Sequence, residues 1–137
     1  MLIWTERFAT GFPEIDEQHR QLIRHVNQLE AMLVKTNPTV EDVQFIAKFL
    51  DFLQDYINSH FGFEEKCMAC HRCSVHEKNL EAHENFRQMF QRFKAKSRKE
   101  GFRMELLIDL NQTINAWIQD HILRIDIQLK PLAGKAA

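Results

Sequence analysis

The feature that most constrains this chain is a histidine and a glutamate placed four residues apart in a helical pattern. His60 and Glu64 flank Phe61-Gly62-Phe63, and side chains at i and i+4 lie on the same face of a helix, one turn apart. The same stripe continues upstream through the apolar residues Val43, Ile46, Leu50, Leu53 and Ile57. Both polar side chains are therefore predicted to point into a core. A buried imidazole and a buried carboxylate are costly unless they are paired or bind a metal.

Apolar residues at steps of three and four predict long helices along most of the chain. Only four glycines and three prolines interrupt 137 residues, and few breakers favour long helices. Thr39, with Asp42 three residues later, is a good N-cap, and Gly101 is a good stop after a charged run. The predicted helices run from 13–16 to about 35–38, then over 40–66, 76–97 and 103–129.

Helices of similar length joined by short connections predict an all-α fold, an up-down-up-down four-helix bundle. Residues 1–15 are predicted to form an extended N-terminal arm that packs its aromatic side chains on the bundle. Residues 67–75 break the helical pattern and are predicted to form a connection. Residues 1–130 are expected to form one domain, and residues 131–137 a tail or the start of a linker.

Charge and hydropathy exclude several classes of protein. The formal net charge is −1, which favours neither nucleic acid nor an anionic membrane as a partner. No apolar run approaches the ~18 residues that span a bilayer. The first seven residues lack the basic and apolar regions of a signal peptide, so a cytoplasmic location is expected.

Each predicted helix carries one histidine on its apolar face. A single such histidine is more often a satisfied core residue than a ligand, but four together favour a metal site. Nitrogen and carboxylate oxygen donors inside a helical bundle suit pairs of iron or manganese ions, and carboxylates can bridge two metals. The candidate metal ligands are His19, His60, Glu64, His83, His121 and Asp126.

One spacing conflicts with a regular fourth helix. His121 and Asp126 are five residues apart, which separates them by ~140° on a helix of ~100° per residue. If both face one centre, a π-type bulge or a widened turn is predicted between them.

The pattern as a whole resembles the hemerythrins, in particular the bacterial hemerythrin domains. The matching pieces are Trp4 and residues 11–19, 60–65, 83–86 and 121–126. The resemblance implies a four-helix bundle with two non-haem iron ions, an oxo or hydroxo bridge, and dioxygen as ligand. By position, His19 and His60 bind one iron and His83 and His121 the other, while Glu64 and Asp126 bridge. Phe61, Phe86 and Trp117 are expected to line a dry oxygen pocket.

The third helix departs from the family pattern. Hemerythrins carry His-x-x-x-His there, but Asn79 stands four residues before His83. The second iron is then expected to have an open or water-filled position, or a distant amide oxygen from Asn79. His76 is a further alternative, if the start of the helix rearranges. A more open site is expected to exchange ligands and to autoxidise readily.

The cysteine stretch leaves several readings open. Cys67, Cys70 and His71 match a haem attachment signature, and with Cys73 they have the ligand types of a zinc or iron–sulfur site. A redox thiol switch is a third reading. The favoured interpretation is a loop whose cysteines partly pack under the end of the bundle.

Cysteine just after Glu64-Glu65, together with Cys73 and Asn79, resembles hemerythrin domains fused to diguanylate cyclase (GGDEF) modules. That resemblance implies a sensor of oxygen or redox state that regulates a C-terminal GGDEF output domain. The alternatives are an oxygen carrier or storage protein, and an oxidase- or peroxidase-type di-iron enzyme. The domain by itself is not expected to be an enzyme.

Overall fold

The computed structural model describes residues 1–37, 39–101 and 103–135. The first helix was predicted to end at about 35–38, but it ends at Leu33, slightly earlier. Pro38 and the last two residues of the predicted tail lie outside the described residues. The longer helices are α1 (Pro13–Leu33), α2 (Val40–Tyr56), α3 (Gly62–Cys70), α4 (His76–Glu100) and α5 (Met104–Arg124). Three short elements accompany them: the 3₁₀-helices η1 (Glu6–Phe8) and η3 (Asp126–Leu132), and the π-helix η2 (Ile57–Phe61).

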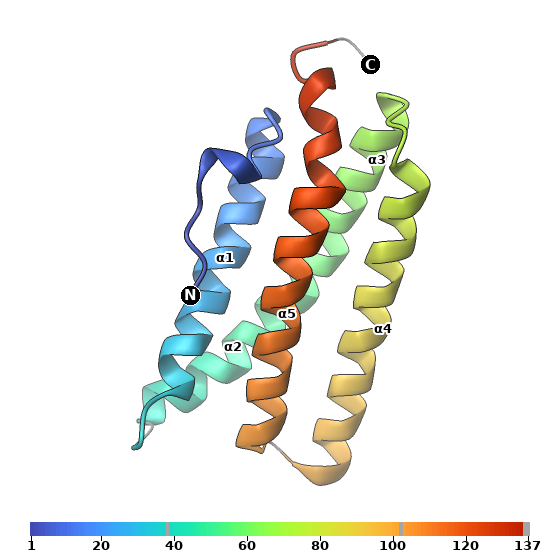
Figure 1. Cartoon of the computed structure of the whole chain (residues 1–137). Coiled ribbons are helices and arrows are strands. Elements are labelled where there is room, and N and C mark those ends of the chain that lie inside the picture. Colours follow the sequence, from blue (N-terminus) through green and yellow to red (C-terminus); the bar gives the residue numbers. More distant parts are fainter. Residues whose placement is uncertain (38, 102, 136–137) are drawn as a thin grey trace.

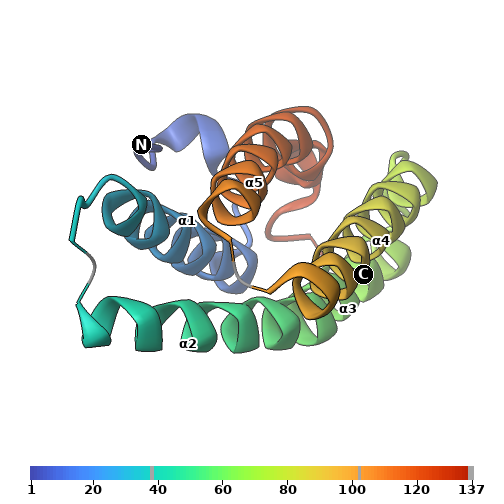
Figure 2. The ribbon, with the colours of Figure 1, turned by 90° about the horizontal axis from the view of Figure 1, so that it is seen from below.

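The elements form the predicted bundle. Because α2, η2 and α3 follow one another without a break, they make one long bent rod that serves as the second of four antiparallel helices (Figure 1). Around the bundle, α1 packs on α5 and α2, and α4 packs on α3 and α5. Seen along the bundle, α2 runs across one side while α3 continues toward α4 (Figure 2). The all-α, up-down-up-down prediction is confirmed.

The N-terminal arm is tied to the start of α1 by one carboxylate. Asp16 accepts hydrogen bonds from the backbone N–H and the hydroxyl of Thr10, each at 2.8 Å, and from the Gly11 N–H at 3.2 Å. Pro13 occupies the first turn of α1, where its missing N–H costs nothing. Trp4 lies under the guanidinium of Arg20, 4.5 Å from its ring centre, and Phe8 is buried. The arm therefore packs on the bundle through aromatic side chains.

The start of α2 confirms the predicted cap and corrects the predicted stripe. Thr39 and Asp42 form a reciprocal capping box. Val43, however, is 60% exposed, and Phe49 is fully buried in its place. The rest of the predicted stripe faces the core: Ile46 and Leu50 pack partly buried against it, and Leu53 and Ile57 are buried. Val43 is exposed because the first turns of α2 lie at the edge of the bundle.

The interruption predicted in the fourth helix is present but has a different form. No π-type turn separates His121 from Asp126; instead α5 ends at Arg124, Ile125 adopts φ −110° and ψ −59°, and Asp126 opens the 3₁₀-helix η3. The π-helix lies in the second rod, at Ile57–Phe61, where a regular helix was predicted. A π turn holds one more residue than an α turn, so it rotates the residues that follow it.

The predicted connection over 67–75 is shorter than expected, because α3 continues to Cys70. Nothing from 63 to 70 breaks a helix, and Met68 anchors its last turn in the interior at 0% exposure. The helix ends with Arg72 at φ +52° and with a hydrogen bond from the Cys73 N–H to the Met68 carbonyl at 2.9 Å. This arrangement is typical of a Schellman motif.

The apolar core fills most of the bundle, and a smaller buried cluster closes one end with Ile15, Met68, Cys73 and Leu129. Polar side chains are buried as well, among them Glu64, one turn before Met68 of the smaller cluster. Within the described part of the chain, no helix is both long enough and apolar enough to cross a membrane.

Candidate metal centre

Six of the predicted site residues meet inside the bundle. We call them the central cluster; none is more than 2% exposed. Each of the four antiparallel rods supplies at least one of them, so the cluster exists only in the folded bundle. They are His19 on α1, His60 on η2, Glu64 on α3, His83 on α4, His121 on α5 and Asp126 on η3.

Glu64 lies at the middle of the central cluster and divides it into two halves. Its Oε2 lies 3.2 Å from Nε2 of His19 and 3.4 Å from Nε2 of His60. Its Oε1 lies 3.1 Å from Nε2 of His83 and 3.6 Å from Nε2 of His121. Each carboxylate oxygen therefore faces its own pair of imidazoles.

Asp126 joins the same two halves from the other side. Its Oδ2 lies 3.2 Å from Nε2 of His19, and its Oδ1 lies 3.0 Å from Nε2 of His121. The break at Ile125 is what places this side chain beside His121, because a continuous helix would carry the two apart. Two carboxylates thus span the gap between a His19 side and a His121 side.

The donor atoms fit a pair of metal ions better than they fit one another. Although they lie close together, five of them have no well-aligned hydrogen bond within the described residues: Glu64 Oε1, His83 Nε2, His121 Nε2, Asp126 Oδ1 and Asp126 Oδ2. Buried polar atoms without partners are costly. Two sets of donors lie within 4.8 Å of one another and could each hold an ion, His19–His60–Glu64 and Glu64–His83–His121. Glu64 is common to both.

In the metal-free chain, the carboxylates and imidazoles of the central cluster shift one another's pKa values. Burial by itself lowers the pKa of His19 and of His121, but Asp126 and Glu64 outweigh it through hydrogen bonds and charge. The pKa values rise to about 9 for His19 and about 10 for His121. Burial raises the pKa of Glu64, but the surrounding histidines bring it well below its usual range. A metal that binds here has to displace these protons.

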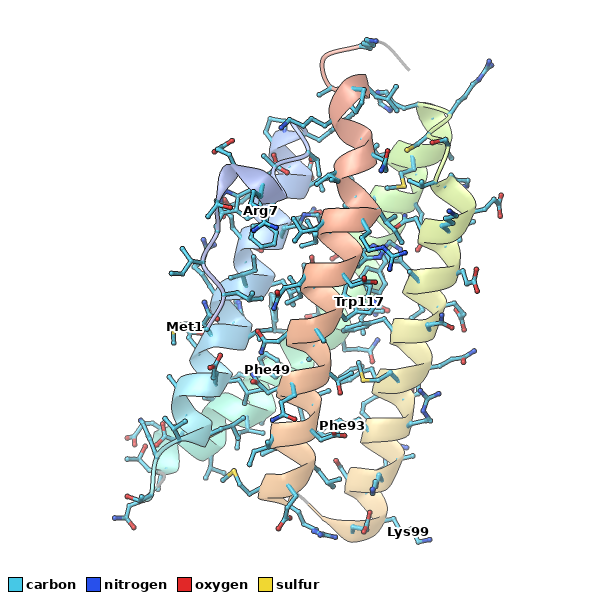
Figure 3. The ribbon with its side chains drawn as sticks, viewed as in Figure 1. Met1, Arg7, Phe49, Phe93, Lys99 and Trp117 are labelled. Atoms are coloured by element: carbon cyan, nitrogen blue, oxygen red, sulfur yellow. The ribbon has the colours of Figure 1, made fainter. Side chains whose placement is uncertain are left out.

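Aromatic rings stack against the imidazoles. Phe61 stacks on His83, with ring centres 3.9 Å apart, and Trp117 stacks on His121 at 4.3 Å. Phe86 meets the Trp117 ring at 4.6 Å and the edge of Phe61 at 5.5 Å. In Figure 3, Trp117 lies between α5 and α4. The three residues predicted to line an oxygen pocket therefore form one apolar wall on the side of His83 and His121.

Sequence reasoning missed the residues that hold the outer nitrogens of the imidazoles. His83 Nδ1 donates to Glu65 Oε2 at 2.8 Å, and Arg87 donates to the same oxygen at 3.1 Å. Gln18 Oε1 contacts His60 Nδ1. The only signal in the sequence was adjacency, since Gln18 precedes His19 and Glu65 follows Glu64. Tyr56 stacks on His60 with ring centres 4.5 Å apart, and burial together with the nearby carboxylates raises the pKa of its hydroxyl well above its usual range.

Asn79 and His76 lie outside the two donor sets. Asn79 is fully buried one turn before His83, and neither its amide nitrogen nor its carbonyl oxygen has a hydrogen-bond partner among the described residues. His76 is partly buried at the start of α4, and its Nδ1 also lacks a partner there. A role for either as a metal ligand stays a prediction.

The cysteine stretch does not gather into a second donor set within the described residues. Cys73 is buried, Cys70 is exposed, and Cys67 is partly buried with its sulfur 3.9 Å from Nδ1 of His71. Cys73 packs with Met68, Ile15 and Leu129 at the end of the bundle. This packing agrees with the favoured reading of the stretch.

Fold and site together define a four-helix metal-binding bundle, and comparison with known proteins agrees. The family model for the hemerythrin HHE cation binding domain matches residues 10–133. A bacteriohemerythrin of Clostridium acetobutylicum is 27% identical over 133 residues, which cover 92% of this chain and 96% of that protein. A bacteriohemerythrin of Stenotrophomonas maltophilia is 25% identical over 89% of this chain and 74% of that protein. One of Pseudomonas aeruginosa is also 25% identical, over 91% of this chain and 76% of that protein.

The chain belongs to the hemerythrin family. Membership implies a domain that binds two non-haem irons and dioxygen. The buried His and Glu sets of the central cluster can hold such metals.

Proposed function

We propose that this chain is a di-iron domain that senses oxygen or redox state through the central cluster. His19 and His60 would hold one iron, His83 and His121 would hold the other, and Glu64 and Asp126 would each contact both. The observation that carries the proposal is the position of Glu64: each of its two carboxylate oxygens faces a separate pair of imidazoles. When bound, the iron pair supplies the electrons that reduce dioxygen reversibly.

The residues around the irons bind, orient and exclude water. The stacked Phe61 and Trp117 rings fix the planes of His83 and His121 and keep bulk water from that side. Asn79 lies one turn before His83 and adds no imidazole, so the second iron would have two imidazoles, like the first, and the Asn79 amide has no hydrogen-bond partner among the described residues. Iron held by these donors would keep a position that no side chain of the described residues fills, and that position would be open to dioxygen.

Two features support a sensor over a carrier. Asp126 opens η3, so the bridging carboxylate is attached directly to the segment that leads toward the C-terminal end of the chain. A change in metal ligation at Asp126 therefore pulls on η3. The resemblance to domains fused to diguanylate cyclases supports a GGDEF module as the output, and no further feature of the described residues bears on that partner.

The first experiment is metal analysis of the purified chain with visible spectra before and after air is admitted. About two irons per chain and an oxygen-dependent visible band support the proposal. Glu64→Gln removes one bridging oxygen and is expected to lower the metal content at least twofold, whereas the exposed Glu81→Gln leaves it unchanged. A wild-type chain with fewer than one iron contradicts the di-iron proposal.

The lifetime of the oxygen-dependent band then separates the roles. A band that decays within minutes in air supports a sensor, and one that persists for hours and reverses under argon supports a carrier. An oxidase-type enzyme is the second candidate, favoured by the partnerless Asn79 beside His83. Sustained oxygen consumption with an electron donor, abolished in Glu64→Gln, would identify that enzyme.

A further inference from the structure

We propose that Glu65 is a positioning residue for the metal pair, held in place by Arg87 and acting through His83. The inference rests on the proposed function, since it concerns one of the imidazoles assigned to the second iron. It adds a role for two residues that the ligand set does not include.

The contact is a charged one. A single oxygen of Glu65, Oε2, accepts a hydrogen bond from His83 Nδ1 at 2.8 Å and another from Arg87 at 3.1 Å. The side chain of His83 is completely buried, and that of Glu65 is 19% exposed. Hydrogen bonds to an ionised acceptor are shorter and roughly twice as strong as neutral ones. Glu65 therefore favours a proton on Nδ1 of His83, and Nε2 then faces the central cluster, 3.1 Å from Glu64 Oε1.

Among the four imidazoles of the central cluster, His83 alone has a charged acceptor at Nδ1 within the described residues. The Nδ1 of His60 meets the neutral amide oxygen of Gln18. The Nδ1 atoms of His19 and His121 have no hydrogen-bond partner in the part of the chain that the structure describes. The two halves of the central cluster thus contain the same number of imidazoles but differ in how strongly one of them is polarised.

Arg87 holds the Glu65 carboxylate in place through a direct hydrogen bond. It lies on α4 one turn after His83, and its guanidinium sits over the Phe61 ring, 5.4 Å from the ring centre. Phe61 is the ring that stacks on His83. Arg87 therefore contacts both groups that hold His83, the Glu65 carboxylate and the Phe61 ring.

A carboxylate behind an imidazole makes the imidazole a better electron donor to a metal. Stronger donation favours the ferric state, so Glu65 lowers the reduction potential of the iron that His83 binds. Because Nδ1 of the other three imidazoles has no charged acceptor among the described residues, the effect is confined to one iron. Glu65 thereby makes the two irons unequal.

Glu65→Gln tests this, since the amide keeps the size of the side chain and removes its charge. Zinc affinity, measured by competition with a chelator, is expected to fall 10- to 100-fold, and the reduction potential of the iron-loaded chain is expected to rise. Arg87→Met, which frees the carboxylate to turn away, should shift both quantities in the same direction by less. Glu81→Gln removes one negative charge from an exposed position of α4 and should shift neither.

Nitrogen NMR of the histidine rings supplies a readout that needs no iron. In wild type, His83 should carry a slowly exchanging proton on Nδ1, and in Glu65→Gln that proton should exchange faster. Equal zinc affinity and potential in Glu65→Gln and Glu81→Gln would overturn the inference. If the wild-type chain binds no metal pair, the proposed function fails instead, and the protonated nitrogen of His83 in the metal-free chain still decides the role of Glu65.

Discussion

Glu64 has no exposed surface, yet it is the side chain on which the whole site depends. A buried carboxylate is costly unless charged or hydrogen-bonded partners surround it, and four imidazoles do so from four rods. Substitution of a single histidine leaves three of these contacts, while substitution of Glu64 removes all four. Residue-scale chemistry therefore explains why the site needs the complete bundle.

Asn79 is the residue expected to set how long an oxygen complex lasts. We predict that Asn79→His slows autoxidation at least tenfold, because an imidazole one turn before His83 would complete the ligands on that side and displace water. Stopped-flow spectroscopy of the iron-loaded chain measures the rate. Asn79→Ala is the matched control, since it removes the amide without adding a donor, and it should autoxidise at least as fast as wild type. If Asn79→His autoxidises at the wild-type rate, Asn79 is not placed beside the reactive iron.

At the scale of elements, the N-terminal arm and the C-terminal segment meet at one glycine. Gly11 has φ +83°, and a Cβ built on it would lie 2.7 Å from Cβ of Ala133. Gly11→Ala is predicted to destabilise the chain by about 1–2 kcal/mol from the backbone conformation alone, and by more from the contact with Ala133. Chemical denaturation monitored by circular dichroism measures the change.

Gly62→Ala is the control for this substitution. Gly62 is helical, with φ −62° and ψ −43°, and nothing lies within 4 Å of its would-be Cβ. Alanine there should be neutral or stabilise the chain by roughly 0.5–1 kcal/mol. A Gly11→Ala variant as stable as Gly62→Ala would show that the arm does not pack on the C-terminal segment.

The capping box of α2 predicts how the start of this helix responds to low pH. The hydrogen bonds from Lys35 and from the Thr39 backbone lower the pKa of Asp42 below its usual value. A carboxyl whose pKa is depressed in the folded state stabilises it above the unfolded pKa and loses that contribution as pH falls through the folded value. We expect the first turn of α2 to fray as pH falls below about 4, before the central helices open. Amide hydrogen exchange at residues 40–44 measures it, and Asp42→Asn should show the frayed exchange pattern at neutral pH.

The bundle and the meeting of the six residues could be predicted from sequence because each histidine lies on an apolar stripe, where spacing alone fixes direction. The π-helix at Ile57–Phe61 could not be predicted, because apolar residues spaced by both three and four positions look the same with or without one extra residue in a turn. The five-residue spacing of His121 and Asp126 predicted an interruption near Ile125, but it did not predict that the helix ends there and continues as a 3₁₀-helix. Glu65 and Arg87 were missed because their bonds to His83 depend on how α3 packs against α4, which no local pattern encodes.

On the scale of the whole molecule, the polar centre lies between two apolar regions. The larger core fills the body of the bundle, and the smaller cluster around Met68 and Leu129 closes the end. In the metal-free chain this places several partnerless polar atoms between them. The apolar regions therefore hold the donors in position, and metal ions relieve the cost of burying them.

Metal removal is accordingly predicted to loosen the bundle unevenly. A ligand that binds only the folded state at 100 times its dissociation constant adds about 2.7 kcal/mol, which for a chain of this size raises Tm by roughly 10 °C. Hydrogen exchange should show the added protection in the first half of α1, η2, α3, the start of α4, the end of α5 and η3, which carry or adjoin the central cluster. Residues 93–100 and the first turns of α2 should change little. Glu64→Gln treated with the same metal is the control and should gain neither. Protection spread evenly over all helices would mean instead that the metal acts on global unfolding, and that the donors do not form a separate unit that opens by itself.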